Sequence, residues 1–166
     1  MKVDFLAEYP QFIETIAGWV FAEWGRLRPG MTLENAIADF RQRAVKNQIP
    51  LSLIAIEGTE VIGCISLKSE EDITRPGLTP WIGGAYVRED WRGKGVGEAM
   101  ITAVENLAYN LGYDELYLSA AGAEGFYSGL GWQVFERVQA EGEDVAVMVR
   151  KLEEGDAGKS AAAPLE

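Results

Sequence analysis

The fold is decided by the run Val87-Arg88-Glu89-Asp90-Trp91-Arg92-Gly93-Lys94-Gly95-Val96-Gly97, which opens a long predicted helix. Its three glycines allow the backbone to pass close to a bound pyrophosphate, because glycine adopts conformations that other residues avoid. Consecutive N–H groups at the start of a helix, together with the positive end of the helix dipole, favour negative charge. The run therefore predicts a site for a phosphorylated cofactor.

The helix that follows this run is amphipathic. Glu98 lies in the first turn, where a carboxylate is favourable, and Gly112 follows as a left-handed residue at the C-terminal end. The apolar positions recur at steps of three and one: Val96, Ala99, Met100, Ala103, Val104, Leu107, Ala108 and Leu111. This stripe predicts that one face of the helix packs on a sheet.

Length and hydropathy limit the architecture. The chain has 166 residues, of which 48% are hydrophobic, and we expect one domain over residues 1–152. The segment 153–166 is rich in Gly, Ala and Ser and predicts a disordered tail. No apolar run approaches the roughly 20 residues that span a bilayer, so we expect a cytoplasmic protein that does not enter the membrane.

The charge and the rare residue types exclude several functions. With 26 acidic and 15 basic residues, the net charge of −11 opposes binding to nucleic acid or anionic lipid. It favours a cationic acceptor; the alternative is that the carboxylates only keep the protein soluble. The chain has no histidine and one cysteine, so we expect no metal site and no His-based triad. Cys64 lies in an alternating apolar stretch and predicts a buried structural thiol.

The periodicity predicts an order of elements along the chain. A strand at 3–6 precedes helices at 11–24 and 32–44, a hairpin at 51–57 and 60–68, a strand at 81–87, the long helix, a strand at 115–119, a helix at 123–130 and a hairpin at 132–138 and 144–150. The strand, helix and strand around the glycine-rich run predict a parallel pair, with the cofactor at the strand ends.

Two motifs together resemble the GCN5-related N-acetyltransferase (GNAT) superfamily. The family motif Arg/Gln-x-x-Gly-x-Gly/Ala between a strand and a helix is met by Arg92, Gly95 and Gly97. Its later motif, Phe-Tyr-x-x-Leu-Gly-Phe/Trp, is met by Phe126, Tyr127, Leu130, Gly131 and Trp132. The order of elements is also similar, so the resemblance covers roughly residues 1–150.

The resemblance implies an α+β fold, with a mixed sheet of about seven strands flanked by about four helices. It implies transfer of acetyl from acetyl-CoA to a primary amine of a small molecule, or of a peptide or protein, by direct attack in a ternary complex. No metal takes part in this chemistry, and family members are often monomers or homodimers. The alternative function is a non-catalytic domain that binds coenzyme A as a sensor or interaction module.

The resemblance also assigns the cofactor site. The backbone of Tyr86 and Val87 is expected to bind the pantetheine arm as an added strand would. The pyrophosphate is expected to lie against Arg92, Gly93, Lys94, Gly95, Val96 and Gly97, with the two cations at the rim. The alternatives are a glycine-rich surface turn and a dinucleotide site, but the glycine spacing differs from Gly-x-Gly-x-x-Gly.

Tyr127 is the candidate catalytic residue, because in many family members this tyrosine protonates the departing thiolate. Its ordinary pKa near 10 keeps the phenol protonated at neutral pH. Helical spacing predicts that Phe126 and Leu130 pack on the core and that Tyr127 faces the cleft. The alternative is that Tyr127 packs against the cofactor without donating a proton.

Two positions depart from the family pattern. Trp81 stands where histone-type members carry a glutamate, so no general base is assigned. Ala120 stands where many members carry an asparagine that contacts the cofactor. For the acceptor side we expect an aromatic-rich wall, although these residues are equally compatible with core packing: Trp19, Phe21, Trp24, Arg26 and Trp81.

Overall fold

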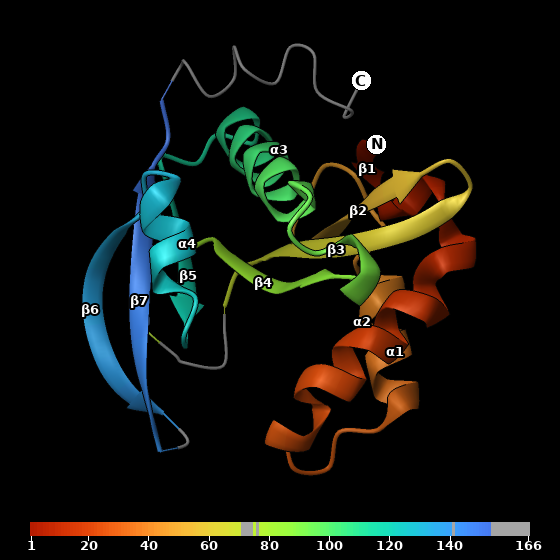
Figure 1. Cartoon of the computed structure of the whole chain (residues 1–166), viewed down its shortest axis with the longest axis horizontal. Coiled ribbons are helices and arrows are strands. Elements are labelled where there is room, and N and C mark those ends of the chain that lie inside the picture. The colour runs from red at the N-terminus through yellow and green to blue at the C-terminus, as the bar shows by residue number, and fades with distance from the viewer. Residues whose placement is uncertain (71–74, 76, 141, 154–166) are drawn as a thin grey trace.

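The computed structural model describes residues 1–70, 75, 77–140 and 142–153, and the side chain of residue 26 is not described. Its strands form one seven-stranded sheet in the order β1-β2-β3-β4-β5-β7-β6 (Figure 1). The strands are β1 (Lys2–Phe5), β2 (Leu51–Glu57), β3 (Glu60–Lys68), β4 (Trp81–Val87), β5 (Glu115–Ala120), β6 (Gln133–Ala140) and β7 (Glu143–Lys151). The predicted tail at 153–166 lies almost wholly outside the described residues.

The helices lie on both faces of the sheet, with α3 on one face and the pair α1 and α2 on the other (Figure 1). Their bounds are α1 (Ile13–Trp24), α2 (Leu33–Gln42), α3 (Val96–Asn110) and α4 (Glu124–Gly129), with short 3-10 turns η1 (Leu6–Glu8), η2 (Pro10–Phe12), η3 (Gly25–Leu27) and η4 (Glu89–Trp91). The mixed sheet and its flanking helices confirm the predicted fold class.

Local sequence signals explain where the helices begin and end. The Oγ1 atom of Thr32 accepts a hydrogen bond of 3.1 Å from the N–H of Asn35, which caps the start of α2. Gly112 follows α3 with a φ of +98°, in the left-handed region that favours glycine at helix C-terminal ends. Both boundaries agree with the sequence prediction.

The alternation of apolar residues along the strands fills both faces of the sheet. On one face, Met100 and Val104 of α3 pack in a cluster with Leu53 of β2. On the other face, Phe40 of α2 packs in a cluster with Cys64 of β3. Cys64 is buried as predicted, and burial raises the pKa of its thiol to about 12.

The parallel strands β4 and β5 meet only near their beginnings. They pair in the sheet at Trp81 and Tyr117, and the N–H of Tyr117 also donates to the carbonyl of Pro80 at 3.0 Å. Beyond this point the strands diverge, as Figure 1 shows. The parallel direction is as predicted. No helix in the described part of the chain is both long and apolar enough to span a membrane.

Candidate functional site

The glycine-rich run forms a tight turn that leads directly into α3. Gly93 has a φ of +75° and Gly95, which precedes the helix, has a φ of +86°. A side chain in this left-handed region costs about 1–2 kcal/mol, so both positions favour glycine. No described side chain caps the start of α3, which leaves the first-turn N–H groups as donors for an anion.

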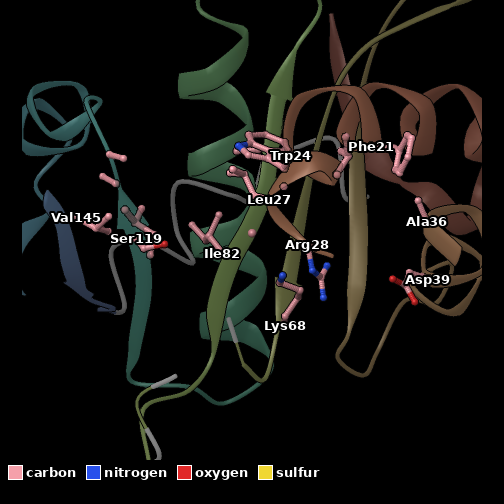
Figure 2. A pocket seen from close by; sticks show the side chains of 18 of the residues that line it. Phe21, Trp24, Leu27, Arg28, Ala36, Asp39, Lys68, Ile82, Ser119 and Val145 are labelled. Carbon is pink, nitrogen blue, oxygen red and sulfur yellow. The ribbon is translucent and has the colours of Figure 1, made fainter. Parts of the chain in front are cut away.

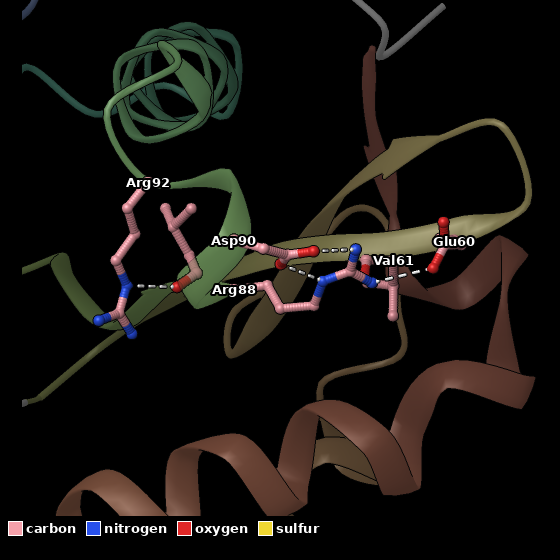
Figure 3. Close-up of polar contacts among 6 residues, drawn as sticks. Glu60, Val61, Arg88, Asp90 and Arg92 are labelled. Carbon is pink, nitrogen blue, oxygen red and sulfur yellow. Dashed lines mark hydrogen bonds and ion pairs between the residues drawn. The ribbon is translucent and has the colours of Figure 1, made fainter.

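The cations of the turn are held over aromatic rings. The Arg92 guanidinium lies 5.2 Å from the centre of the Tyr86 ring, and its Nε donates to the carbonyl of Val87 at 2.9 Å (Figure 3). The Lys94 ammonium lies 5.0 Å from the centre of the Trp91 ring. Arg92 therefore lies beside the end of β4, where the carbonyl of Val87 accepts its hydrogen bond, and Lys94 lies over Trp91 of η4.

Arg88 braces the segment between β4 and the glycine-rich turn. Its Nε donates to Asp90 at 2.7 Å, and its Nη1 donates to Glu60 of β3 at 3.2 Å (Figure 3). The adjacent Arg88 guanidinium lowers the pKa of the Asp90 carboxyl. These contacts connect the segment before the glycine-rich turn to β3 and hold the backbone that leads into α3 in place.

The start of α3 meets α4 through Gly97 and Phe126. A Cβ atom added to Gly97 would lie 3.5 Å from the ring of Phe126, whereas the Val96 side chain is buried in the core. Phe126 is 48% exposed, so the prediction that it packs on the core is wrong. Because Phe126 lies on the side of α4 that faces the start of α3, its ring lies against Gly97 instead.

Tyr127 is held by the residues that follow it in the chain. The backbone N–H of Trp132 donates to the carbonyl of Tyr127 at 3.1 Å, and the two ring centres are 6.2 Å apart. Burial raises the pKa of the Tyr127 phenol above its ordinary value of 10.0. The hydroxyl is therefore protonated across the neutral range, as a general acid requires.

The buried carboxylate of Glu105 on α3 holds the Trp132 side chain in position. Glu105 is only 6% exposed, and it accepts a hydrogen bond of 3.0 Å from the indole Nε1–H of Trp132. The Arg150 guanidinium of β7 lies 3.4 Å from the same carboxylate oxygen and also donates to the carbonyl of Gly131 at 3.4 Å. This network joins α3, β7 and the chain after α4, and so sets the position of Tyr127.

A cavity of about 580 Å³ extends from the divergence of β4 and β5 to the α1–α2 connection and the β6–β7 turn (Figure 2). Tyr127 contributes to its wall, as predicted. The lining residues are Val20, Phe21, Trp24, Gly25, Leu27, Arg28, Met31, Ala36, Asp39, Phe40, Arg43, Lys68, Ile82, Gly83, Gly84, Ala85, Leu118, Ser119, Ala120, Ala121, Ala123, Tyr127, Ala140, Glu143 and Val145.

The aromatic residues expected on the acceptor side separate into two groups. Phe21 and Trp24 line the cavity. Trp19 stacks on Tyr86 with ring centres 5.4 Å apart and lies outside the lining. Trp81 is 1% exposed and donates from Nε1 to the carbonyl of Leu78, so it belongs to the core. Core packing, the alternative weighed from the sequence, therefore holds for these two tryptophans.

Charged residues that sequence reasoning missed also line the cavity. They come from separate elements and connections of the chain: Arg28, Asp39, Arg43, Lys68 and Glu143. No local motif marks them, because only the folded topology brings these positions together. Among the described residues, no three side chains of His, Cys, Asp or Glu gather in a way that could hold a metal ion.

Comparisons with known proteins agree with this architecture. The model of the Acetyltransferase (GNAT) family matches residues 13–132. The fold is similar to an aminoglycoside 6'-N-acetyltransferase complexed with coenzyme A, with a TM-score of 0.73 and 14% identity over 91% of this chain and 97% of that chain. It is also similar to a GNAT-family acetyltransferase from Streptococcus pneumoniae (TM-score 0.65, 13% identity, 87% and 95% covered). An IAA acetyltransferase from Bacillus cereus gives a TM-score of 0.53 at 24% identity, with 72% and 85% covered. No curated protein matches the sequence.

Proposed function

The chain belongs to the acetyltransferase (GNAT) family, and from this premise we propose that it transfers the acetyl group of acetyl-CoA to a primary amine. The observation that carries the proposal is the cavity that runs from the divergence of β4 and β5 to Tyr127. One end of this cavity suits an extended donor arm, and its walls enclose enough space for an acceptor of small-molecule size. An exposed amine of a peptide is the alternative acceptor.

The turn before α3 suits the pyrophosphate of the donor. Gly93 and Gly95 place the backbone in conformations that bring consecutive N–H groups to the start of the helix. An added Cβ at either glycine would meet no protein atom within 4 Å, so the space beside this backbone is open. Arg92 and Lys94 add positive charge beside it, and the residues present therefore fit a phosphate group.

The unpaired length of β4 suits the pantetheine arm. Beyond Trp81, β4 is paired with β3 on one side only, and its residues Gly83, Gly84 and Ala85 line the cavity. An extended arm can bind along such an edge through backbone groups, as an added strand would. The small side chains allow a close approach. We therefore extend the binding segment from the predicted Tyr86 and Val87 to these three residues.

The proposed reaction is direct attack by the amine. Acetyl-CoA supplies the thioester whose acetyl carbon receives the lone pair of the uncharged amine. As the C–N bond forms and the C–S bond breaks, the hydroxyl of Tyr127 donates its proton to the departing sulfur, and the proton that the attacking nitrogen loses passes through solvent to restore the phenol. Burial raises the pKa of Tyr127, which keeps this proton in place until the sulfur takes it.

The substitution Tyr127→Phe tests this role. We expect turnover to fall by about 10²–10⁴-fold, the usual contribution of a general acid, while the affinity for coenzyme A stays within about twofold. Turnover is measured by thiol release and affinity by calorimetry. Tyr113→Phe is the control, because Tyr113 lies beyond the far end of α3 and outside the cavity lining. Unchanged turnover in Tyr127→Phe would contradict the assignment of Tyr127 as the general acid.

A further inference from the structure

The cavity has walls of opposite charge, and this division identifies the class of acceptor. Building on the proposed acetyl transfer, we propose that the acceptor is a small amine whose other end carries an anionic group. Its ammonium end lies toward Tyr127 and Glu143, and its anionic end lies toward Arg28 and Lys68. A chain of net charge −11 would by itself favour the opposite, a cationic acceptor.

Three cations come from one side of the cavity. Arg28 follows η3 and Lys68 ends β3, and Figure 2 shows both side chains extending into the same part of the cavity. The third cation, Arg43, follows α2; its Nη1 donates to Ser66 at 3.2 Å, and its guanidinium lies 4.6 Å from the Phe40 ring centre. These contacts hold a guanidinium at the wall of the cavity, and a guanidinium can bind an anion through charge-assisted hydrogen bonds.

Cations outnumber carboxylates among the described residues that line this side. Asp39 of α2 is the carboxylate that lines it, so three cations face one anion among the described lining residues. Among the residues that the structure describes, three of the chain's 15 basic residues line the cavity, compared with two of its 26 acidic ones. The cations keep their other contacts within the protein, and a ligand anion adds to these contacts. The described lining of the cavity therefore has more cations than carboxylates, whereas the whole chain has more carboxylates than cations.

The opposite side, built from β5, α4 and β7, carries one carboxylate. Glu143 at the start of β7 lines the cavity together with Tyr127 and Ser119, and no described cation lies among the lining residues of this side. A carboxylate here attracts an ammonium group. Between the two sides, the apolar residues Trp24 and Ile82 suit a hydrocarbon chain.

This arrangement discriminates between amines of equal length. An anion at the far end gains charge-assisted hydrogen bonds from Arg28 and Lys68, whereas a second ammonium there meets like charge. Acceptors with several positive charges, such as polyamines, are therefore poor substrates. The effect weakens with salt, because the cavity is open to solvent at Arg28, which is exposed.

The test compares aminohexanoate, hexylamine and hexanediamine, which share one chain and differ in the terminal group. With acetyl-CoA, we expect kcat/KM for aminohexanoate to exceed the other two by about tenfold or more, because its carboxylate gains charge-assisted hydrogen bonds that the other two ends lack. Arg28→Gln and Lys68→Gln should each remove most of this advantage by raising KM. Arg41→Gln is the control, because Arg41 is exposed on α2 and lies outside the cavity lining.

Each outcome decides the proposal. Equal or better use of hexanediamine, or an equal effect of Arg28→Gln on all three amines, would overturn it. Preference for aminohexyl phosphate over aminohexanoate supports the anionic end and identifies phosphate as its group. Calorimetry of aminohexanoate with the CoA-saturated protein measures binding of the acceptor without turnover. Weaker binding of aminohexanoate to the Arg28→Gln variant than to the wild type supports the inference. Absence of aminohexanoate binding to the wild type overturns it. Absence of thiol release from every amine, with this binding intact, would contradict the proposed acetyl transfer alone.

Discussion

Gly95→Ala perturbs the turn before α3 without changing its charge. Gly95 has a φ of +86°, and an alanine Cβ at this position would meet no protein atom within 4 Å. The substitution therefore costs about 1–2 kcal/mol through the left-handed backbone alone. If the turn leaves this conformation to avoid the cost, the N–H groups no longer converge on the pyrophosphate. The corresponding loss of affinity for coenzyme A is about five- to thirtyfold.

The matched control is Gly112→Ala at the other end of the same helix. Gly112 has a φ of +98° and equally open surroundings, so its substitution costs a similar free energy of unfolding. Urea denaturation should give similar losses of stability for the two variants, and calorimetry with coenzyme A should separate them. Wild-type affinity in Gly95→Ala, or equal losses of affinity in both variants, would refute the assignment of the turn as the pyrophosphate site.

Three further predictions concern buried groups. Burial raises the pKa of Tyr127, so turnover at saturating substrate should not fall on the alkaline side until above about pH 10; a decline nearer neutrality would contradict its role as acid. Glu105→Ala leaves the indole N–H of Trp132 buried without its acceptor, and should lower the free energy of unfolding in urea by about 1–3 kcal/mol; a stability equal to wild type would show that this hydrogen bond contributes nothing. Cys64 is buried, with its pKa raised to about 12, so a thiol reagent should modify it only after unfolding, and rapid modification of the native protein would contradict its burial.

The elements near the glycine-rich run were predictable because their signals are local. The stripe of apolar residues gives α3, and Gly112 marks its end within a few residues of sequence. The cap at Thr32 and the alternation around Cys64 are equally short-range. Such patterns can be recognised without knowing which strands become neighbours in the sheet.

The charged residues of the cavity were not predictable, because no local sequence signal marks them. Arg28, Lys68 and Glu143 are far apart in the sequence, and only the sheet order brings their elements around one space. Phe126 shows the same limit: helical spacing predicts that it packs on the core, but the position of α4 beside α3 places its ring against Gly97. The cytoplasmic location and the single domain remain predictions from sequence.

Release of free thiol from acetyl-CoA in the presence of an amine panel tests the proposed acetyl transfer most directly. We predict thiol release that depends on the amine, appears together with an equal amount of N-acetylated product by mass spectrometry, and falls by about 10²–10⁴-fold in Tyr127→Phe. The buried Cys64 adds no background to this assay while the protein is folded. Tight binding of coenzyme A with no thiol release from any amine would contradict the proposal and identify a non-catalytic coenzyme A-binding domain.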